Sequence, residues 1–284
     1  MATFSEDLRA LGHPTLVVTP AVRGAEVSDE GILRVPAIKD IRGTGFSLRL
    51  PFSPGLRRRL DSFQPHIVHT HQPFLLGDTG LREARSRDIP LVFTHHTFYE
   101  RYADFFGFEH EATRRLARWL PTAYANLCDA VIAPTPSIAE IIRERGVAAP
   151  VHVIPTGIDV ASQGAGVGRR CRERYGIAPE VPLIGHVGRL IPAKNMSFLA
   201  RAIAGALVRT PRARALLAGN GESVPTVHRI CSEHGVADRV VFTGNLAGQS
   251  LADAYAAMDL FAFASRTDTQ GLVLVEALLR AGPE

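Results

Sequence analysis

The sequence predicts an α/β protein built from two doubly wound domains, each with a parallel sheet between layers of helices. Short apolar runs, typical of buried strands, alternate with stretches of helical length along most of the chain. This alternation starts again at Val181, after a glycine-rich stretch. Strands and helices that alternate in this way form parallel sheets with helices on both faces. With 284 residues, of which 46% are hydrophobic, the chain can bury a large core, and we expect two domains.

The first domain is predicted over residues 1–160. Its strands are short and apolar, and a helix-like segment precedes the first of them. The strands are predicted at 16–19, 66–69, 91–94, 130–133 and 151–154, and the helices at 4–11, 77–87, 109–128 and 136–145. Residues 161–180 follow as a linker. Their glycine-rich part, 161–168, follows no strand directly, so we interpret it as a loop and not as a dinucleotide-binding turn.

The second domain is predicted over residues 181–284 and repeats the pattern of the first. Its strands are predicted at 181–187, 213–218, 240–243 and 260–264, and its helices at 196–209, 223–234 and 249–258, with a further apolar helix after the turn at 265–271. In open sheets of this kind ligands bind at the carboxyl ends of the strands. No Gly-x-Gly-x-x-Gly follows the first strand of either domain, which disfavours a dinucleotide-dependent reductase.

The most informative motif is a pair of acids, Asp268 and Glu276, placed eight positions apart where the last strand gives way to a helix. The turn between them, Thr269-Gln270-Gly271, leaves backbone N–H groups free at the start of the helix. These groups and the positive end of the helix dipole suit an anion such as a phosphate. A carboxylate one turn into the helix can accept hydrogen bonds from the hydroxyls of a sugar. The alternative for the pair alone is a surface turn with two solvated acids.

Two further strand ends carry chemistry that suits phosphates. Arg189 and Lys194 follow the strand at 181–187, and arginine offers a fork of donors where lysine offers a mobile point charge. The chain has only two lysines, Lys39 and Lys194, so a lysine at this place is a specific feature. The strand at 213–218 ends in Gly219-Asn220-Gly221, where glycines permit close approach of the backbone to a ligand.

Together these residues resemble the C-terminal half of the retaining GT-B glycosyltransferases of family 4. That family carries Gly-Arg-Leu with a following Lys-Asn, then Gly-x-Gly, then Glu-x7-Glu. The corresponding residues are Gly188-Arg189-Leu190, Lys194-Asn195, Gly219-Asn220-Gly221 and Asp268-x7-Glu276. The resemblance covers nearly all of the chain, and it implies the GT-B plan of two Rossmann-like domains that face a cleft.

The resemblance also implies roles for single residues. Arg189 and Lys194 would hold the diphosphate of a nucleotide sugar, Glu276 would hold the ribose, and Asp268, one methylene shorter than the family's glutamate, would lie beside the donor sugar. The predicted donor site comprises Gly188, Arg189, Lys194, Gly219, Gly221, Asn245, Asp268, Gly271, Leu272 and Glu276, and the predicted catalytic residues are Arg189, Lys194, Asp268 and His96. No cofactor and no metal are implied, and a UDP-sugar is favoured over a GDP-sugar.

The acceptor side is predicted in the first domain, where histidines cluster at two strand ends. These are His66, His69 and His71 in one strand and directly after it, and His95 and His96 after the next. Imidazoles can donate and accept hydrogen bonds with sugar hydroxyls, so we assign His71, His96 and Tyr99 to the acceptor side. The run His96-Thr-x-Tyr-x-x-Tyr resembles family members that glucosylate diacylglycerol. A zinc site and packing histidines are the alternatives, although zinc usually has a supporting carboxylate or thiol that is not evident here.

Two basic stretches with apolar or aromatic neighbours, 55–60 and 114–120, suit an anionic membrane surface, and solvated helix faces are the alternative. The net charge of +4 gives no reason to expect a nucleic-acid partner. The three cysteines, Cys128, Cys171 and Cys231, lie far apart and suggest a reduced compartment. We therefore expect a cytoplasmic protein, peripheral on the inner face of the cell membrane, with a lipid or small-molecule acceptor.

Both ends depart from the family. A strand and a glycine-rich loop usually precede the first helix, and the family continues well beyond the helix that carries Glu276, so we expect a chain truncated at both ends. An active retaining hexosyltransferase is the first hypothesis, favoured by Arg189, Lys194 and Glu276. The alternative is an inactive fragment that at most binds nucleotide or a partner chain, favoured by the missing strand.

Overall fold

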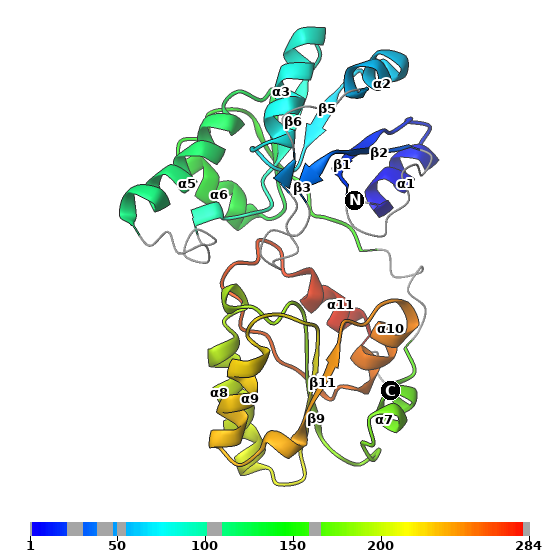
Figure 1. Ribbon diagram of the computed structural model, residues 1–284, viewed down its shortest axis with the longest axis vertical. Helices are drawn as coiled ribbons and strands as arrows, with labels where there is room; N and C mark the ends of the chain where they lie inside the picture. Colours follow the sequence, from blue (N-terminus) through cyan, green and yellow to red (C-terminus); the bar gives the residue numbers. More distant parts are fainter. Residues whose placement is uncertain are drawn as a thin grey trace. The chain divides into compact units, whose positions relative to one another are not determined.

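The computed structural model describes residues 2–21, 31–38, 48–49, 55–100, 110–158 and 166–280. The chain divides into two units. Figure 1 shows the helices and strands of both, coloured along the sequence. One unit is built from Met1–Tyr99 and Arg115–Gly157, and the other from Ile158–Glu284 together with Glu100–Arg114. The three cysteines are free and buried.

The main sheet of the first unit has four parallel strands in the order β5-β6-β7-β8. The strands are β5 (Val68–Thr70), β6 (Leu91–Thr94), β7 (Ala130–Ala133) and β8 (Val151–Val153), and helices α3 (Leu76–Arg87), α5 (Glu111–Ala125) and α6 (Pro136–Glu144) alternate with them. Alternate strand residues, such as Phe93 and Val131, point to one face and pack with Tyr124 of α5 and Ile142 of α6. The predicted strands and helices of this part of the chain are confirmed to within a few residues.

Smaller elements complete the first unit. Helix α1 (Ala2–Ala10) matches the predicted N-terminal helix, and β1 (Val17–Pro20) pairs in parallel with β2 (Ile32–Val35) in a sheet of its own. A two-residue antiparallel pair, β3 (Ala37–Ile38) with β4 (Leu48–Arg49), was not predicted. Helix α2 (Leu56–Phe63) was not among the predicted helices, although a solvated helix face was the alternative given for 55–60. Strands of two residues carry no readable periodicity. The three consecutive arginines of α2 conceal its helical pattern, since only Leu56 is buried.

The second unit is a doubly wound sheet of four parallel strands in the order β11-β10-β9-β12. The strands are β9 (Leu183–Val187), β10 (Arg214–Ala218), β11 (Val240–Gly244) and β12 (Leu260–Phe261). Figure 1 shows α8 (Met196–Arg209) and α9 (Val224–Glu233) on one side of this sheet and α7 (Gly168–Arg174) and α10 (Gly248–Ala257) on the other. Leu217 packs with the first pair of helices, and its neighbour Leu216 packs in the core that contains α7 and α10.

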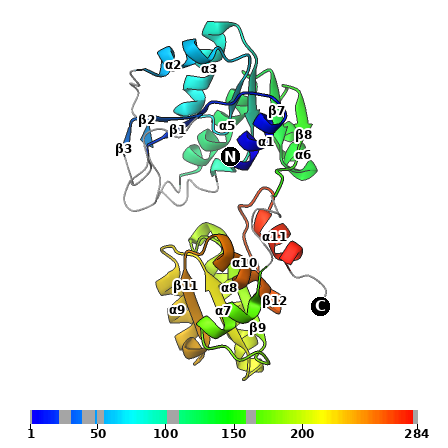
Figure 2. The ribbon, with the colours of Figure 1, turned by 90° about the vertical axis from the view of Figure 1, so that its right-hand side faces the viewer.

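Two 3-10 helices and a last α-helix complete the second unit. Two short 3-10 helices, η3 (Pro192–Lys194) and η4 (Ala237–Arg239), precede α8 and β11. Helix α11 (Leu272–Arg280) lies next to α10, as Figure 2 shows. The strand predicted over 260–264 is shorter than expected. Its ladder to β9 ends at Phe261, and the next carbonyl, that of Ala262, accepts a hydrogen bond from the ring Nδ1 of His186 at 2.9 Å.

The region predicted as a linker, 161–180, contains helix α7, and its residues 161–165 lie outside the described part of the chain. The glycines at its start are explained by close packing on α10. A Cβ atom on Gly166 would lie 2.1 Å from the carbonyl oxygen of Ala252, and one on Gly168 would lie 2.3 Å from that of Ala256. Arg170 and the backbone N–H of Val167 both bind the carboxylate of Asp253 on α10. These contacts fix α7 on the second unit.

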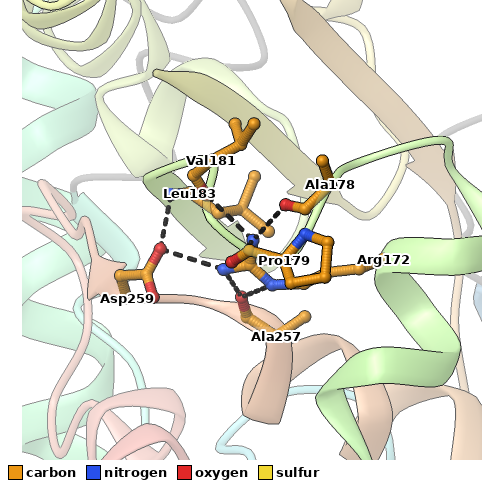
Figure 3. Close-up of polar contacts among 7 residues, drawn as sticks. All are labelled: Arg172, Ala178, Pro179, Val181, Leu183, Ala257 and Asp259. Atoms are coloured by element: carbon orange, nitrogen blue, oxygen red, sulfur yellow. Dashed lines mark hydrogen bonds and ion pairs between the residues drawn. The ribbon is translucent and has the colours of Figure 1, made fainter. Parts of the chain in front are cut away.

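Arg172 of α7 is the centre of a buried hydrogen-bond network (Figure 3). The residue is 8% exposed, and its guanidinium donates to carbonyls of the loop before β9, to the carbonyl at the end of α10 and to one carboxylate. The acceptors are Ala178 O (3.1 Å), Pro179 O (3.2 Å), Val181 O (2.8 Å), Ala257 O (2.8 Å from Nη2) and Asp259 Oδ2 (2.9 Å). The same carboxylate oxygen accepts the backbone N–H of Leu183 at 2.7 Å. Arg172 therefore ties α7 to the beginnings of β9 and β12.

Replacement of this arginine is expected to destabilise the second unit. Arg172→Met keeps the apolar stem but removes the donor shared by four backbone carbonyls and leaves Asp259 with only the N–H of Leu183. This should cost about 3 kcal/mol of unfolding free energy. Urea unfolding followed by circular dichroism measures the change. Arg169→Met is the matched control, because Arg169 lies on the same helix with its side chain exposed. Equal urea midpoints for the two variants would show that the network does not stabilise the unit.

Candidate functional site

The predicted donor residues of the second unit gather at the carboxyl edge of its sheet. Gly188 follows β9, Gly219 follows β10, and Asn245 comes directly after β11. Asp268 and Gly271 belong to the segment that connects β12 to α11, and Leu272 is the first residue of α11. Parallel strands bring these turns to one edge, which is why motifs up to about ninety positions apart meet there.

The glycines of these turns permit two strand-end loops to touch each other. A Cβ atom on Gly219 would lie 1.9 Å from the carbonyl oxygen of Gly188, and one on Gly221 would lie 2.3 Å from that of Leu190. Both glycines have positive φ angles, 141° and 157°, which residues other than glycine rarely adopt. The loops are joined by a hydrogen bond from the N–H of Leu190 to the carbonyl of Asn220 at 2.9 Å. The glycines thus bring the Arg189 turn against the neighbouring strand end.

Lys194 and Asp268 form an ion pair that joins the turn after β9 to the turn after β12. The ammonium nitrogen lies 2.6 Å from Oδ1 of Asp268, and the two side chains are 15% and 26% exposed. A second contact supports the pair, because the buried hydroxyl of Thr267 donates to the carbonyl oxygen of Ala193 at 3.1 Å. A cation and a carboxylate are therefore held side by side at the sheet edge, with limited access to solvent.

Helix α11 adds N–H groups and a second carboxylate. Gly271, at φ 65°, makes the sharp entry into the helix, and the N–H of Leu274 already bonds to the carbonyl of Gly271. The preceding N–H groups at the helix start form the positive end of the helix dipole. Glu276 lies one turn into α11 and is half-buried, and its Oε2 accepts a hydrogen bond from the phenol of Tyr255 at 2.7 Å.

Two predicted donor residues stand apart from these contacts. Arg189 is exposed on the turn after β9, and Asn245 is exposed after β11. Neither takes part in the Lys194–Asp268 pair. The structure therefore brings together Lys194, Asp268, the glycine turns and the start of α11.

In the first unit the predicted acceptor-side histidines form one cluster at the ends of β5 and β6. Nδ1 of His71 lies 2.9 Å from Nε2 of His96, and the two rings stack with their centroids 5.2 Å apart. His69 lies beside them, with its Nε2 at 2.7 Å from the hydroxyl of Thr94. Phe4 of α1 meets the rings of His69 and His71 edge-on. The cluster is thus covered on one side by an aromatic ring.

Burial keeps these imidazoles neutral. Burial, followed by the nearby imidazoles of His69 and His96, lowers the pKa of His71 to about 3. Burial and the charge of His96 lower the pKa of His69 to about 4. Burial also lowers the pKa of His96. At neutral pH each ring therefore offers one N–H donor and one lone pair.

The remaining acceptor-side residue, Tyr99, packs its ring edge-on against Phe74 with a centroid distance of 5.0 Å. Burial raises the pKa of its phenol, so the hydroxyl remains protonated. Tyr102 of the same sequence run lies outside the described residues. In the part of the chain that the structure describes, no group of three or more His, Cys, Asp or Glu side chains could hold a metal ion.

Some residues that hold the site residues in place lie far from them in the sequence and were not predicted. Tyr255 is 21 positions before Glu276 on another helix, and Thr267 contacts a carbonyl 74 positions away. In the first unit, the phenol oxygen of Tyr124 on α5 lies 2.9 Å from Gly77 O and 3.0 Å from the hydroxyl of Thr70, across 47 and 54 positions. No local spacing in the sequence signals contacts of this kind, since each depends on how distant elements pack.

The two basic stretches lie on exposed helix faces. Arg57, Arg58 and Arg59 of α2 are exposed. On α5, Arg115, Arg118, Trp119 and Thr122 line a shallow cavity of about 190 Å³ with Arg145 from the end of α6, and the indole of Trp119 is 61% exposed. Among the helices of the described residues, none has the length and apolar character needed to cross a bilayer.

Comparison with protein families gives two matches that together span both units. Residues 1–162 match the model of Glycosyltransferase Family 4, and residues 181–283 match that of Glycosyl transferases group 1. The chain is 27% identical over 294 residues to the alpha-monoglucosyldiacylglycerol synthase of Streptococcus pneumoniae, which covers 99% of the chain and 65% of that protein. It is 30% identical over 284 residues to a GDP-mannose-dependent alpha-mannosyltransferase of Mycobacterium tuberculosis, covering 98% and 71%. The chain thus spans about two thirds of the length of these relatives.

Solved structures have the same fold. Sucrose-phosphate synthase from Thermosynechococcus elongatus superposes with a TM-score of 0.75 at 18% identity, covering 99% of the chain and 73% of that structure. Anabaena HepE in complex with UDP-glucose superposes with a TM-score of 0.63 at 24% identity, covering 80% and 61%.

The neutral histidine cluster is expected to make the first unit sensitive to acid. In the unfolded chain these imidazoles take up protons as the pH falls through about 6.5, whereas folded His71 and His69 stay neutral down to about 4 or below. The unfolded state then binds more protons, so the unfolding free energy falls with pH in this window, by about 1.4 kcal/mol per pH unit and proton. The fluorescence of Trp119, the single tryptophan, reports thermal unfolding of this unit.

His71→Gln is expected to flatten the fall of the melting temperature between pH 6.5 and pH 4.5. His228→Gln on the exposed face of α9 is the control and should leave the slope unchanged. A slope that is the same in the His71 variant as in the unaltered protein would contradict the assignment.

Proposed function

The chain belongs to glycosyltransferase family 4 and has the GT-B type of α/β fold, and on this premise we propose that it transfers a hexose from a nucleotide-diphosphate sugar to a lipid or small-molecule acceptor, with retention of configuration. The observation that carries the proposal is the Lys194–Asp268 ion pair next to the start of α11. A cation, a carboxylate and the N–H groups at the start of a helix meet at the sheet edge, and all three suit a sugar diphosphate.

The proposed chemistry is stabilisation of a leaving diphosphate. The bond between the anomeric carbon and the phosphate oxygen breaks, and its electron pair leaves with the nucleoside diphosphate. Lys194, Arg189 and the N–H groups of α11 neutralise the charge that develops there, which is electrostatic catalysis by preorganised donors. The acceptor hydroxyl attacks the same face of the sugar, and its proton passes to a phosphate oxygen of the leaving group. Asp268 orients the hydroxyls of the donor sugar.

The rest of the donor is assigned to the neighbouring turns. Glu276 accepts hydrogen bonds from the ribose, and the turn with Asn245 contacts the base through backbone groups. We propose a UDP-sugar as the donor; UDP-glucose is the ligand in the complex of HepE, a protein of the same fold. The mycobacterial relative, named for GDP-mannose, makes a GDP-sugar the alternative to test.

The histidine cluster of the first unit is proposed to serve the acceptor. Neutral imidazoles can accept a hydroxyl proton in a hydrogen bond and donate to a second oxygen, which suits a glycerol or sugar acceptor. His96 is the member assigned to the reacting groups, with His71 as its hydrogen-bonded support at 2.9 Å. The basic face of α5 is proposed to rest on an anionic membrane surface that contains a lipid acceptor. This face combines arginine side chains with an exposed indole.

The donor assignment predicts a selective loss in Lys194→Ala. In the unaltered chain, a nucleotide at a hundred times its Kd should add about 2.7 kcal/mol to the unfolding free energy. The variant should melt close to the unaltered chain without ligand, lose most of this ligand shift, and transfer sugar at least about a hundredfold more slowly. Thermal melts with UDP, GDP, UDP-glucose and GDP-mannose, together with a sugar-transfer assay, measure these effects.

Arg201→Ala, an exposed cation on α8, is the matched control. An unchanged transfer rate in the Lys194 variant at saturating donor would refute the diphosphate assignment. A melt that rises with nucleotide but no transfer to any lipid or sugar acceptor would favour the alternative of a nucleotide-binding protein without activity.

The membrane assignment predicts that vesicles change the emission of Trp119. Vesicles with phosphatidylglycerol should shift the emission to the blue, and vesicles of phosphatidylcholine alone should not. Each basic residue near an anionic surface contributes about 1 kcal/mol, so Arg118→Glu, a change of two charges, should weaken partitioning about 30-fold. Arg201→Glu in the second unit is the control. Equal shifts with both lipids, or an unaffected Arg118 variant, would contradict an electrostatic membrane surface on α5.

A further inference from the structure

We propose that Tyr255 is a positioning residue for nucleotide recognition, which orients Glu276 toward the ribose through a hydrogen bond. The inference deepens the proposed function and rests on it, because it concerns the same carboxylate. Tyr255 lies on α10 and Glu276 on α11, so the hydrogen bond joins two helices of the second unit.

The phenol is held in place on several sides. Tyr255 is 4% exposed, its ring packs against Phe261 at a centroid distance of 5.8 Å, and the guanidinium of Arg280 lies 5.1 Å from the ring centroid. Its hydroxyl donates to Oε2 of Glu276 at 2.7 Å. Packing therefore fixes the position of the ring, and with it the position of the hydroxyl.

In the hydrogen bond between Tyr255 and Glu276, only the phenol can donate. Burial, then the hydrogen bond to Glu276 and its charge, raises the pKa of the Tyr255 phenol, so the hydroxyl stays protonated and acts as the donor. A glutamate on a helix surface has three side-chain torsions that can vary, and a bond from a fixed donor to one oxygen removes most of this freedom. The other oxygen and the remaining lone pairs of the carboxylate can then accept bonds from two neighbouring hydroxyls, as a ribose presents them.

Packing alone does not account for the hydroxyl. The ring fills the core between α7, α10 and the sheet, which a phenylalanine would also do. The oxygen adds the bond to Glu276. Loss of the hydroxyl should therefore act on ribose recognition and leave the fold intact.

The test measures nucleotide affinity with and without a ribose hydroxyl. Calorimetry on the full chain gives the Kd of the nucleoside diphosphate, UDP or GDP, that binds the unaltered protein and of its 2′-deoxy and 3′-deoxy forms. The unaltered protein should bind one of the deoxy forms about tenfold more weakly than the ribonucleotide, or weaker still, as expected for the loss of a hydrogen bond to a charged group. Tyr255→Phe should bind the ribonucleotide several-fold more weakly but bind that deoxy form as the unaltered protein does. Glu276→Gln removes the charged acceptor itself, so it should show the largest loss of discrimination between the ribo and deoxy forms.

Tyr175→Phe is the matched control, because Tyr175 is a half-buried tyrosine packed against the same core. It should leave both affinities unchanged. Equal weakening of the ribo and deoxy forms by Tyr255→Phe, or no change in either, would overturn the positioning role. So would an unaltered protein that binds nucleotide without regard to the ribose hydroxyls. An unaltered protein that binds neither UDP nor GDP would instead refute the proposed function on which the inference rests.

Discussion

The hydrogen bonds of Arg172 are the constraint on which the second unit depends. One buried guanidinium joins α7, the end of α10 and the residues just before β9 and β12. Asp259 shares its carboxylate between Arg172 and the N–H of Leu183, so the beginnings of β9 and β12 are fixed against each other. The opposite ends of these two strands lead to Lys194 and Asp268. The ion pair at the carboxyl edge thus relies on a register that is set at the amino edge.

Several glycines of the second unit are explained by backbone packing alone, without a ligand. Gly219 and Gly221 let the loops after β9 and β10 approach to within contact of their backbones. Gly166 and Gly168 do the same for α7 against α10. In both places a side chain would separate elements whose hydrogen bonds depend on close approach. The loop that carries Arg189 and Lys194 is therefore positioned by the loop after β10. The carboxyl edge of the sheet is thus formed before any ligand binds.

The sequence carried enough information to predict the fold class and the place of the donor motifs. The long helices and the apolar strands have clear periods, so 196–209 and 130–133 were predicted with the bounds that the structure has. The carboxyl edge followed from the alternation of strands and helices. The Arg172 network, Tyr255 and Thr267 were not predictable, because their partners lie up to 87 positions away and depend on packing. The two-residue strand β12 was overestimated for a similar reason, since a side chain of β9 bonds the next carbonyl.

The shortened acid at position 268 has a physical consequence for the proposed donor site. Its carboxylate lies 2.6 Å from the ammonium of Lys194, and the side chains are only partly exposed. A lysine ammonium has three N–H donors, so it can keep Asp268 and still bind phosphate oxygens. The pair is neutral as a whole, whereas a nucleoside diphosphate carries more than one negative charge. In the proposed donor site, the exposed residue Arg189 and the start of α11 would supply the positive potential that the neutral pair lacks. The Lys194–Asp268 pair would then lie between the diphosphate and the sugar, and Lys194 and Arg189 would share the neutralisation of the diphosphate charge.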